Sequence, residues 1–106
     1  MPKYFFQASY TAEGTKGLLK DGGSKRRATV EGLVKGLGGR LESFYYAFGE
    51  TDVLGVIDLP DNVSIAALSL AVNASGAVNL KVTVLLTPEE IDQATKKSVN
   101  YRPPGH

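Results

Sequence analysis

The chain has 106 residues, the length of one domain, and its 12 basic and 11 acidic residues nearly cancel, which argues against nucleic acid and anionic membranes as partners. It contains no cysteine, so disulfides, thiolate metal sites and cysteine nucleophiles are excluded, and a reducing compartment fits. It has no apolar run of transmembrane length and no apolar signal segment at its start, so we expect a cytoplasmic protein.

The first third of the chain predicts a strand followed by two helical segments. Residues 3–10 alternate and are rich in aromatic side chains, which is typical of a β-strand. Thr11 can cap a short helix over residues 12–19, which the paired glycines further on must interrupt. Ser24 can cap a second helix over residues 25–37. The apolar side chains of that helix recur with the spacing of one buried stripe, and they are Val30, Leu33, Val34 and Leu37.

The centre of the chain predicts a β-hairpin. Its strands cover residues 40–48 and 53–59, and residues 49–52 join them as a short loop. We expect a positive φ at Gly49, which glycine takes without strain, and hydrogen bonds from loop N–H groups to Asp52. Alternation gives the first of these strands two faces, which are Leu41, Ser43, Tyr45 and Ala47 against Glu42, Phe44, Tyr46 and Phe48.

The last third predicts a helix, a strand and a short final helix. Asn62 or Ser64 can cap the first helix, which ends near residue 74. The strand covers residues 78–86 and alternates in polarity. The run Thr87-Pro88-Glu89-Glu90 is a capping-box signature with proline at the first helical position, so it opens a helix that extends to about residue 97.

This order of elements predicts an α+β fold with the ferredoxin-like βαββαβ topology and a C-terminal helix. Its antiparallel sheet would have the strand order 4-1-3-2, with both main helices on one face. We expect one domain over residues 1–98 and an extended tail over residues 99–106.

The open face of such a sheet would not be consistently polar, because the first two strands carry apolar side chains on both faces. Monomers rarely expose large apolar patches, so we expect a homo-oligomer, a dimer or higher, in which a second copy covers this face. Face-to-face packing of two sheets gives a dimeric α/β barrel, with Phe44, Tyr46 or Phe48 near the contact.

Motifs along most of the chain resemble the GYD-domain family. They are Tyr10-Thr11 with Gly14 and Lys16, Gly38-Gly39, Gly49-x-x-Asp52, Asp58-Leu59-Pro60-Asp61, Gly76 and the strand end from Thr83 to Thr87. The family's naming motif is Gly-x-Tyr-Asp, and this chain has Thr51 in place of the tyrosine. The resemblance implies a ferredoxin-like fold and self-association, and it implies no particular reaction.

One group of candidate site residues could line a cleft between the sheet and the helices. Tyr10, Lys16, Tyr45 and Asp52 are the candidate ligand-binding residues, and Tyr10, Lys16 and Asp52 are the candidate catalytic ones. Each also has a structural interpretation, since Asp often closes a turn and a buried Tyr needs only a partner for its hydroxyl.

A second group, Ser24, Lys25, Arg26 and Arg27, stands at a predicted helix start, where free N–H groups and the helix dipole favour an anion. The alternative is a loop with solvated cations, because the full P-loop spacing is missing. The only histidine is the terminal His106, and no spacing of histidine and carboxylates supports a metal site, so we expect no metal and no cofactor.

Three functions therefore stay open. The first is a small self-associating domain that binds a small ligand in the cleft. The second is a cofactor-independent enzyme acting on a small organic substrate, and the third is anion or phosphate binding at residues 22–27. The sequence does not decide whether the protein is an enzyme.

Overall fold

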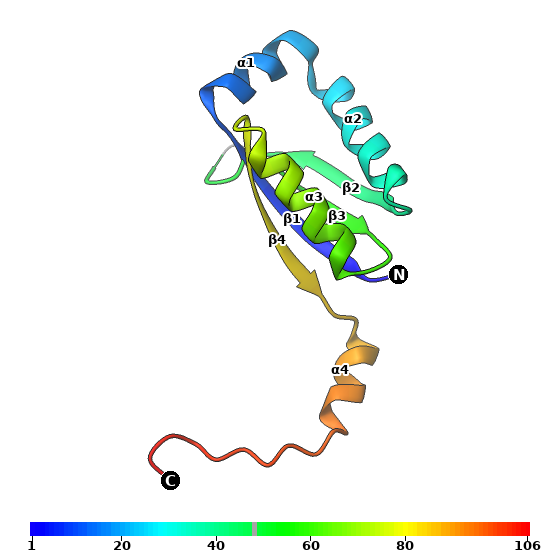
Figure 1. Cartoon of the computed structure of the whole chain (residues 1–106), viewed down its shortest axis with the longest axis vertical. Coiled ribbons are helices and arrows are strands. Elements are labelled where there is room, and N and C mark those ends of the chain that lie inside the picture. Colours follow the sequence, from blue (N-terminus) through cyan, green and yellow to red (C-terminus); the bar gives the residue numbers. More distant parts are fainter. Residues whose placement is uncertain (48) are drawn as a thin grey trace.

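Four strands form one antiparallel sheet with the main helices on one of its faces, in a computed structural model that describes residues 1–47 and 49–106 (Figure 1). The elements are β1 Lys3–Tyr10, α1 Ala12–Asp21, α2 Gly23–Gly36, β2 Arg40–Tyr46, β3 Val53–Asp58, α3 Asn62–Ala74, β4 Val78–Leu85 and α4 Pro88–Thr95. The strand order is β2-β3-β1-β4, which is the predicted order. The ferredoxin-like βαββαβ topology is thereby confirmed.

Two of the predicted helix starts are confirmed by their side-chain contacts. The Thr11 hydroxyl accepts a hydrogen bond from the Gly14 N–H at 3.3 Å and caps α1. At α4, the Glu90 N–H donates to the Thr87 hydroxyl at 3.1 Å, and the Thr87 N–H donates to the Glu90 carboxylate at 2.9 Å. Both are local signals, because the capping side chain and its N–H partner lie three residues apart.

The other two helix starts differ from the prediction. The N-cap of α2 is Gly22, not Ser24, and its φ of 83° turns the chain sharply between α1 and α2. Only glycine takes this angle readily, so α1 can continue to Asp21 before the break. The N-cap of α3 is Asp61 rather than Asn62 or Ser64, since its carboxylate accepts a hydrogen bond from the Ser64 N–H at 2.9 Å.

A β-bulge in β2 changes which face its side chains take. Leu41 pairs with Ile57 while Ser43 pairs with Val56, so two steps on β2 match one step on β3. Leu41 therefore joins Phe44 on the helix-facing side, and the predicted strict alternation over β2 is wrong at this point. Phe48, which the prediction assigned to the same strand, lies outside the described residues.

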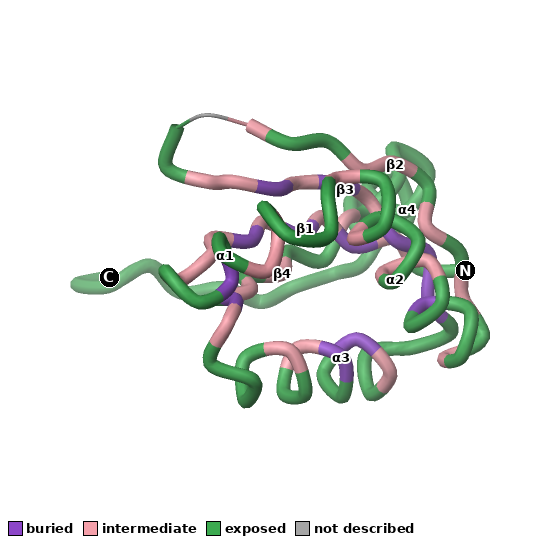
Figure 2. Tube along the Cα trace, turned by 90° about the horizontal axis from the view of Figure 1, so that it is seen from above, coloured by how far each residue is buried: buried purple, intermediate pink, exposed green. Residues whose placement is uncertain are grey.

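The core lies between the sheet and the helices, as Figure 2 shows from the buried segments of the strands and of the sheet-facing side of α3. Tyr4 is fully buried and its hydroxyl donates a hydrogen bond to the Asn62 side chain at 2.7 Å. The buried apolar residues are Tyr4, Phe6, Ala8, Val34, Val53, Ile57, Leu59, Ile65, Leu68 and Val78. Each large side chain buried in this way contributes about 1.5–3 kcal/mol to folding.

Two of the aromatic side chains of β2, those of Phe44 and Tyr46, lie on the helix-facing side of the sheet. Phe44 packs on Phe6 at a centroid distance of 6.1 Å and on Tyr46 at 5.3 Å. Phe44 and Tyr46 pair with Gly55 and Val53 of β3, which belong to that face. The prediction that Phe44 or Tyr46 contacts a second copy through the open face is therefore wrong, because the strand register turns both rings inward.

The C-terminal segment extends away from the sheet as an arm, with α4 and the tail beyond the end of β4 (Figure 1). Several of its apolar side chains are exposed, among them Leu86, Ile91, Val99 and Tyr101. Within residues 1–47 and 49–106, no helix combines the length and the apolar character that crossing a membrane requires.

Candidate functional site

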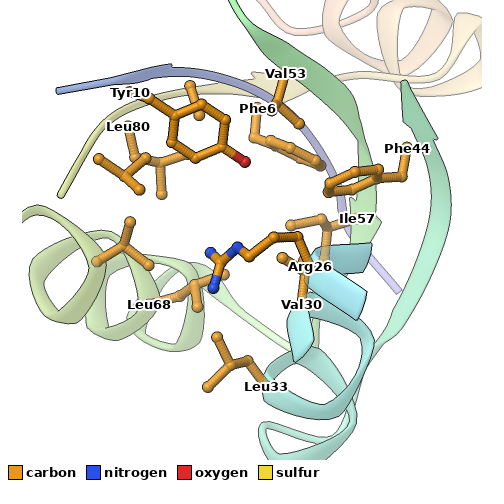
Figure 3. A pocket seen from close by; sticks show the side chains of 13 residues that line it. Phe6, Tyr10, Arg26, Val30, Leu33, Phe44, Val53, Ile57, Leu68 and Leu80 are labelled. Atoms are coloured by element: carbon orange, nitrogen blue, oxygen red, sulfur yellow. The ribbon is translucent and has the colours of Figure 1, made fainter. Parts of the chain in front are cut away.

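The helices leave a cleft over the middle of the sheet. α2 packs mainly over β2 and α3 over β4, so β1 and β3 form the floor between them (Figures 1 and 3). We call this space the helix cleft and define it by Phe6, Tyr10, Arg26, Phe44 and Leu68, which line it. Most of these lining side chains are apolar, so a molecule that entered between them would meet mainly apolar surface.

The helix cleft has an inner and an outer part, which share Tyr10, Arg26 and Leu68. The inner part is narrow, with about 60 Å³ of free space. The outer part reaches under α1 to Leu18 and has a volume of about 480 Å³. That size falls in the range of roughly 300–1,000 Å³ that is usual for small-molecule sites.

Arg26 is the one charged residue among the described residues that line the inner part of the cleft. Figure 3 shows its guanidinium extending between the Tyr10 ring and Leu68. Its position follows from helix periodicity, because Arg26 stands four and seven residues before Val30 and Leu33 on the apolar stripe of α2. The predicted stripe does not include Arg26, although the same spacing places the arginine on it.

The predicted anion group at the start of α2 is not gathered at one point. Successive helical residues point about 100° apart, so three consecutive cations cannot face the same ligand. Lys25 pairs with Asp21 at the end of α1 at 3.8 Å, and Arg27 pairs with Glu31 along α2 at 3.1 Å. Ser24 and Arg27 line a shallow hollow beside β2, and Arg26 lines the helix cleft.

Tyr10 and Tyr46 stand at one end of the helix cleft, where a second hollow of about 370 Å³ adjoins it. The Tyr46 hydroxyl donates a hydrogen bond to the Gly23 carbonyl at 3.0 Å. Burial raises the pKa of Tyr46, the neighbouring Tyr10 hydroxyl raises it further, and the Arg26 charge opposes both. The Tyr46 phenol therefore stays protonated near neutral pH and serves as a hydrogen-bond donor rather than a base.

Asp52 lines the second hollow with Tyr10, and its backbone groups and one of its carboxylate oxygens form hydrogen bonds. Its carboxylate accepts a hydrogen bond from the Tyr10 N–H at 2.8 Å, and its N–H donates to the Ala8 carbonyl at 2.9 Å. Its carbonyl accepts from the Ala47 N–H at 2.9 Å. The expected bonds within the hairpin loop are thus replaced by bonds to β1, which tie the β2–β3 connection to the end of that strand.

Three of the four predicted ligand-binding residues, Lys16, Tyr45 and Asp52, lie outside the lining of the helix cleft. Lys16 is exposed on α1, and Tyr45 is 66% exposed on the side of β2 opposite to Phe44 and Tyr46. Of the predicted group, the structure brings only Tyr10 and Asp52 together. The described glycines with a positive φ also do not include Gly49, so the expected turn geometry there is not supported.

A charged cluster that the sequence did not indicate lies on the open face of the sheet. Asp58 is only 5% exposed and accepts hydrogen bonds from Lys3 at 2.8 Å and from Arg40 at 3.0 Å. Burial acts to raise the pKa of Asp58, but the bonds from Lys3 and Arg40 outweigh it and the pKa is lowered. Lys3 also binds Glu42 at 2.7 Å, and its own pKa is raised by both carboxylates.

This cluster joins the ends of three strands, because Lys3 belongs to β1, Arg40 and Glu42 to β2, and Asp58 to β3. Its charges satisfy one another, which is typical of a structural ion-pair network. Among the described residues, no three histidine, cysteine or acidic side chains are grouped so that they could hold a metal ion.

Comparison with known proteins finds one family. A family model described as the GYD domain matches residues 4–95, from β1 to the last residue of α4. No curated protein and no solved structure matches the chain.

Proposed function

The chain belongs to the GYD-domain family, and on that premise we propose that it is a binding domain that takes a small apolar molecule into the helix cleft. The observation that carries this proposal is the gap between α2 and α3, which leaves apolar core side chains facing free space. Phe6, Phe44 and Leu68 line this gap together with only two polar side chains, those of Tyr10 and Arg26.

The energetic argument concerns apolar surface. A side chain that faces a water-filled cleft keeps part of its unfavourable hydration, at about 25 cal/mol for each Å² of apolar area. A ligand that fits the cleft removes this area from water on the protein and on itself. The outer volume of about 480 Å³ has room for one small organic molecule.

Binding is better supported than catalysis by the same residues. The enzyme alternative needs Tyr10, Lys16 and Asp52 around one substrate, and Lys16 lies outside the cleft lining. The Asp52 carboxylate is engaged with the Tyr10 N–H. A general base must reach the proton that it abstracts, and neither Lys16 nor Asp52 belongs to the described lining of the helix cleft.

A fluorescence titration with N-phenyl-1-naphthylamine, a neutral apolar dye, tests the proposal. We expect saturable binding to the native protein. Leu33→Trp should weaken binding about tenfold or more, because Leu33 lines both parts of the cleft and a larger ring would occupy them.

Leu70→Trp is the matched control, since Leu70 is 73% exposed on α3 and outside the cleft lining. It should bind the dye like the native protein. Dye binding that is absent from the native protein, or equal in Leu33→Trp and Leu70→Trp, would overturn the proposal.

We also propose that two copies associate through the open faces of their sheets, as a dimeric α/β barrel. Supporting this, the open face carries Phe5, Leu54, Val56 and Leu85, which are only partly buried within one chain, and the exposed ring of Tyr45. A second sheet would cover these side chains. A stable contact of this kind buries roughly 800 Å² on each partner.

A further inference from the structure

The guanidinium of Arg26 lies in apolar surroundings. Arg26 is partly buried, and the labelled side chains around it in the cleft lining include Val30, Leu33 and Leu68 (Figure 3). A charged group in such a place loses part of its hydration, and this loss costs free energy unless a partner compensates for it.

The two neighbouring cations of α2 each have an acidic partner that compensates for their charge. Lys25 pairs with Asp21, the last residue of α1, and Arg27 pairs with Glu31, one turn further along α2. Among the residues that the structure describes, no ion pair or hydrogen bond engages the Arg26 guanidinium. Within the described part of the chain the positive charge in the cleft therefore has no counter-charge, and an anion from outside the chain can supply one.

The other charged groups of the cleft stand at its rim. Glu13 and Asp21, both of α1, line the outer part, and the described ion pairs do not join either of them to Arg26. Tyr10 adds a hydroxyl group, which Figure 3 shows turned toward the same space as the guanidinium. The lining of the inner cleft therefore offers one positive charge, the phenolic hydroxyl of Tyr10 and apolar walls.

Resting on the proposed binding function, we infer that the ligand is an apolar organic anion. Arg26 binds its acidic group, and Leu33, Leu68 and Val72, which line both parts of the cleft, hold its apolar body. Arginine suits this task because its planar fork of N–H donors matches the two oxygens of a carboxylate or a related acid. The inference assigns to Arg26 a separate role from that of Lys25 and Arg27, with which it forms one basic run in the sequence.

Two dyes with the same aromatic skeleton test the inference. 8-Anilinonaphthalene-1-sulfonate is N-phenyl-1-naphthylamine with an added sulfonate, so their difference in affinity isolates the contribution of the negative charge. We expect the native protein to bind the sulfonate dye at least about tenfold more tightly than the neutral one, as a charge-assisted contact implies.

Arg26→Gln should remove most of that preference and leave the affinity for the neutral dye nearly unchanged. Arg26→Lys keeps the charge and should retain part of the preference. Arg27→Gln is the matched control, because Arg27 belongs to the same helix, carries the same charge and pairs with Glu31 on the surface. It should behave like the native protein toward both dyes.

The outcomes separate the inference from the proposed function. Equal affinity of the native protein for both dyes would overturn the assignment of Arg26 and leave binding in the cleft standing. Equal loss of both dyes in Arg26→Gln would also overturn it, since Arg26 would then only support the cleft wall. Absence of binding for either dye would overturn the cleft as a site altogether.

Discussion

The carboxylate of Asp52 and the backbone N–H of Tyr10 form a hydrogen bond of 2.8 Å that closes the end of β1 against the β2–β3 connection. The bond holds Tyr10 where its ring lines the helix cleft. It gives the aspartate of the Gly49-x-x-Asp52 run a structural role that does not depend on a ligand.

Asp52→Ala should therefore destabilise the fold by about 1.5–3 kcal/mol, the usual contribution of a hydrogen bond to a charged group. Asp52→Asn should cost less, because the amide oxygen can still accept the bond from Tyr10. Urea unfolding of the three proteins measures the difference. Unchanged stability of Asp52→Ala, combined with loss of dye binding, would instead make Asp52 a ligand-binding residue.

The ion-pair cluster on the open face predicts a pH dependence of stability. The pKa of Asp58 in the folded protein is below its ordinary value of 3.8, because Lys3 and Arg40 stabilise the carboxylate against the effect of burial. Its contribution is therefore complete above that value and is lost as the pH falls through the lower pKa of the folded state.

Replacing Asp58 by Asn should lower stability at neutral pH and flatten its decline in acid. Thermal unfolding between pH 2 and pH 7, roughly the range over which carboxylates titrate, measures this. Asp92→Asn is the control, since Asp92 is exposed on α4 and forms no ion pair within the described part of the chain. Parallel pH profiles for Asp58→Asn and the native protein would contradict the prediction.

A close backbone approach at Gly14 predicts a strong effect of any side chain there. An added Cβ would lie 2.1 Å from the Ala77 carbonyl oxygen, which also accepts the hydrogen bond from the Thr11 N–H at 3.0 Å. Gly14→Ala should cost more than about 1 kcal/mol, because α1 must move away from the start of β4.

Gly17→Ala in the same helix is the matched comparison, since a Cβ at Gly17 would meet no atom within 4 Å. It should stabilise the protein by about 0.5–1 kcal/mol through the better helix propensity of alanine. Chemical denaturation of both variants checks the two opposite signs. A similar stability for the two would mean that α1 does not pack on the Ala77 segment as described.

Self-association through the open face predicts sensitivity to charge at its centre. Val56 lies on that face in β3, and Val56→Arg should place an unpaired cation between two sheets and convert the protein to a monomer. Light scattering at micromolar concentration measures the mass. Leu70→Arg, on the exposed side of α3, should leave the oligomer intact. A native protein that is already monomeric would refute the association.

The sequence by itself determined the order of the elements, the strand order and the caps at Thr11 and Thr87. These depend on local information, since periodicity selects helix or strand and a cap contacts an N–H only three residues away. The ferredoxin-like topology then follows from the order of elements, because few arrangements of four antiparallel strands and two helices bury every apolar face.

Only the tertiary structure decided which side chains meet. The bulge in β2 moved Leu41 to the helix-facing side, and the approach of two chain segments gave Asp52 the Tyr10 N–H as its partner. Likewise Arg26 lines the cleft, while Lys25 and Arg27 form ion pairs on the protein surface. Adjacent residues of a helix point in directions about 100° apart, so only one of the three cations faces the space between α2 and α3. Such contacts join residues far apart in the chain, and their geometry depends on the packing of the whole sheet.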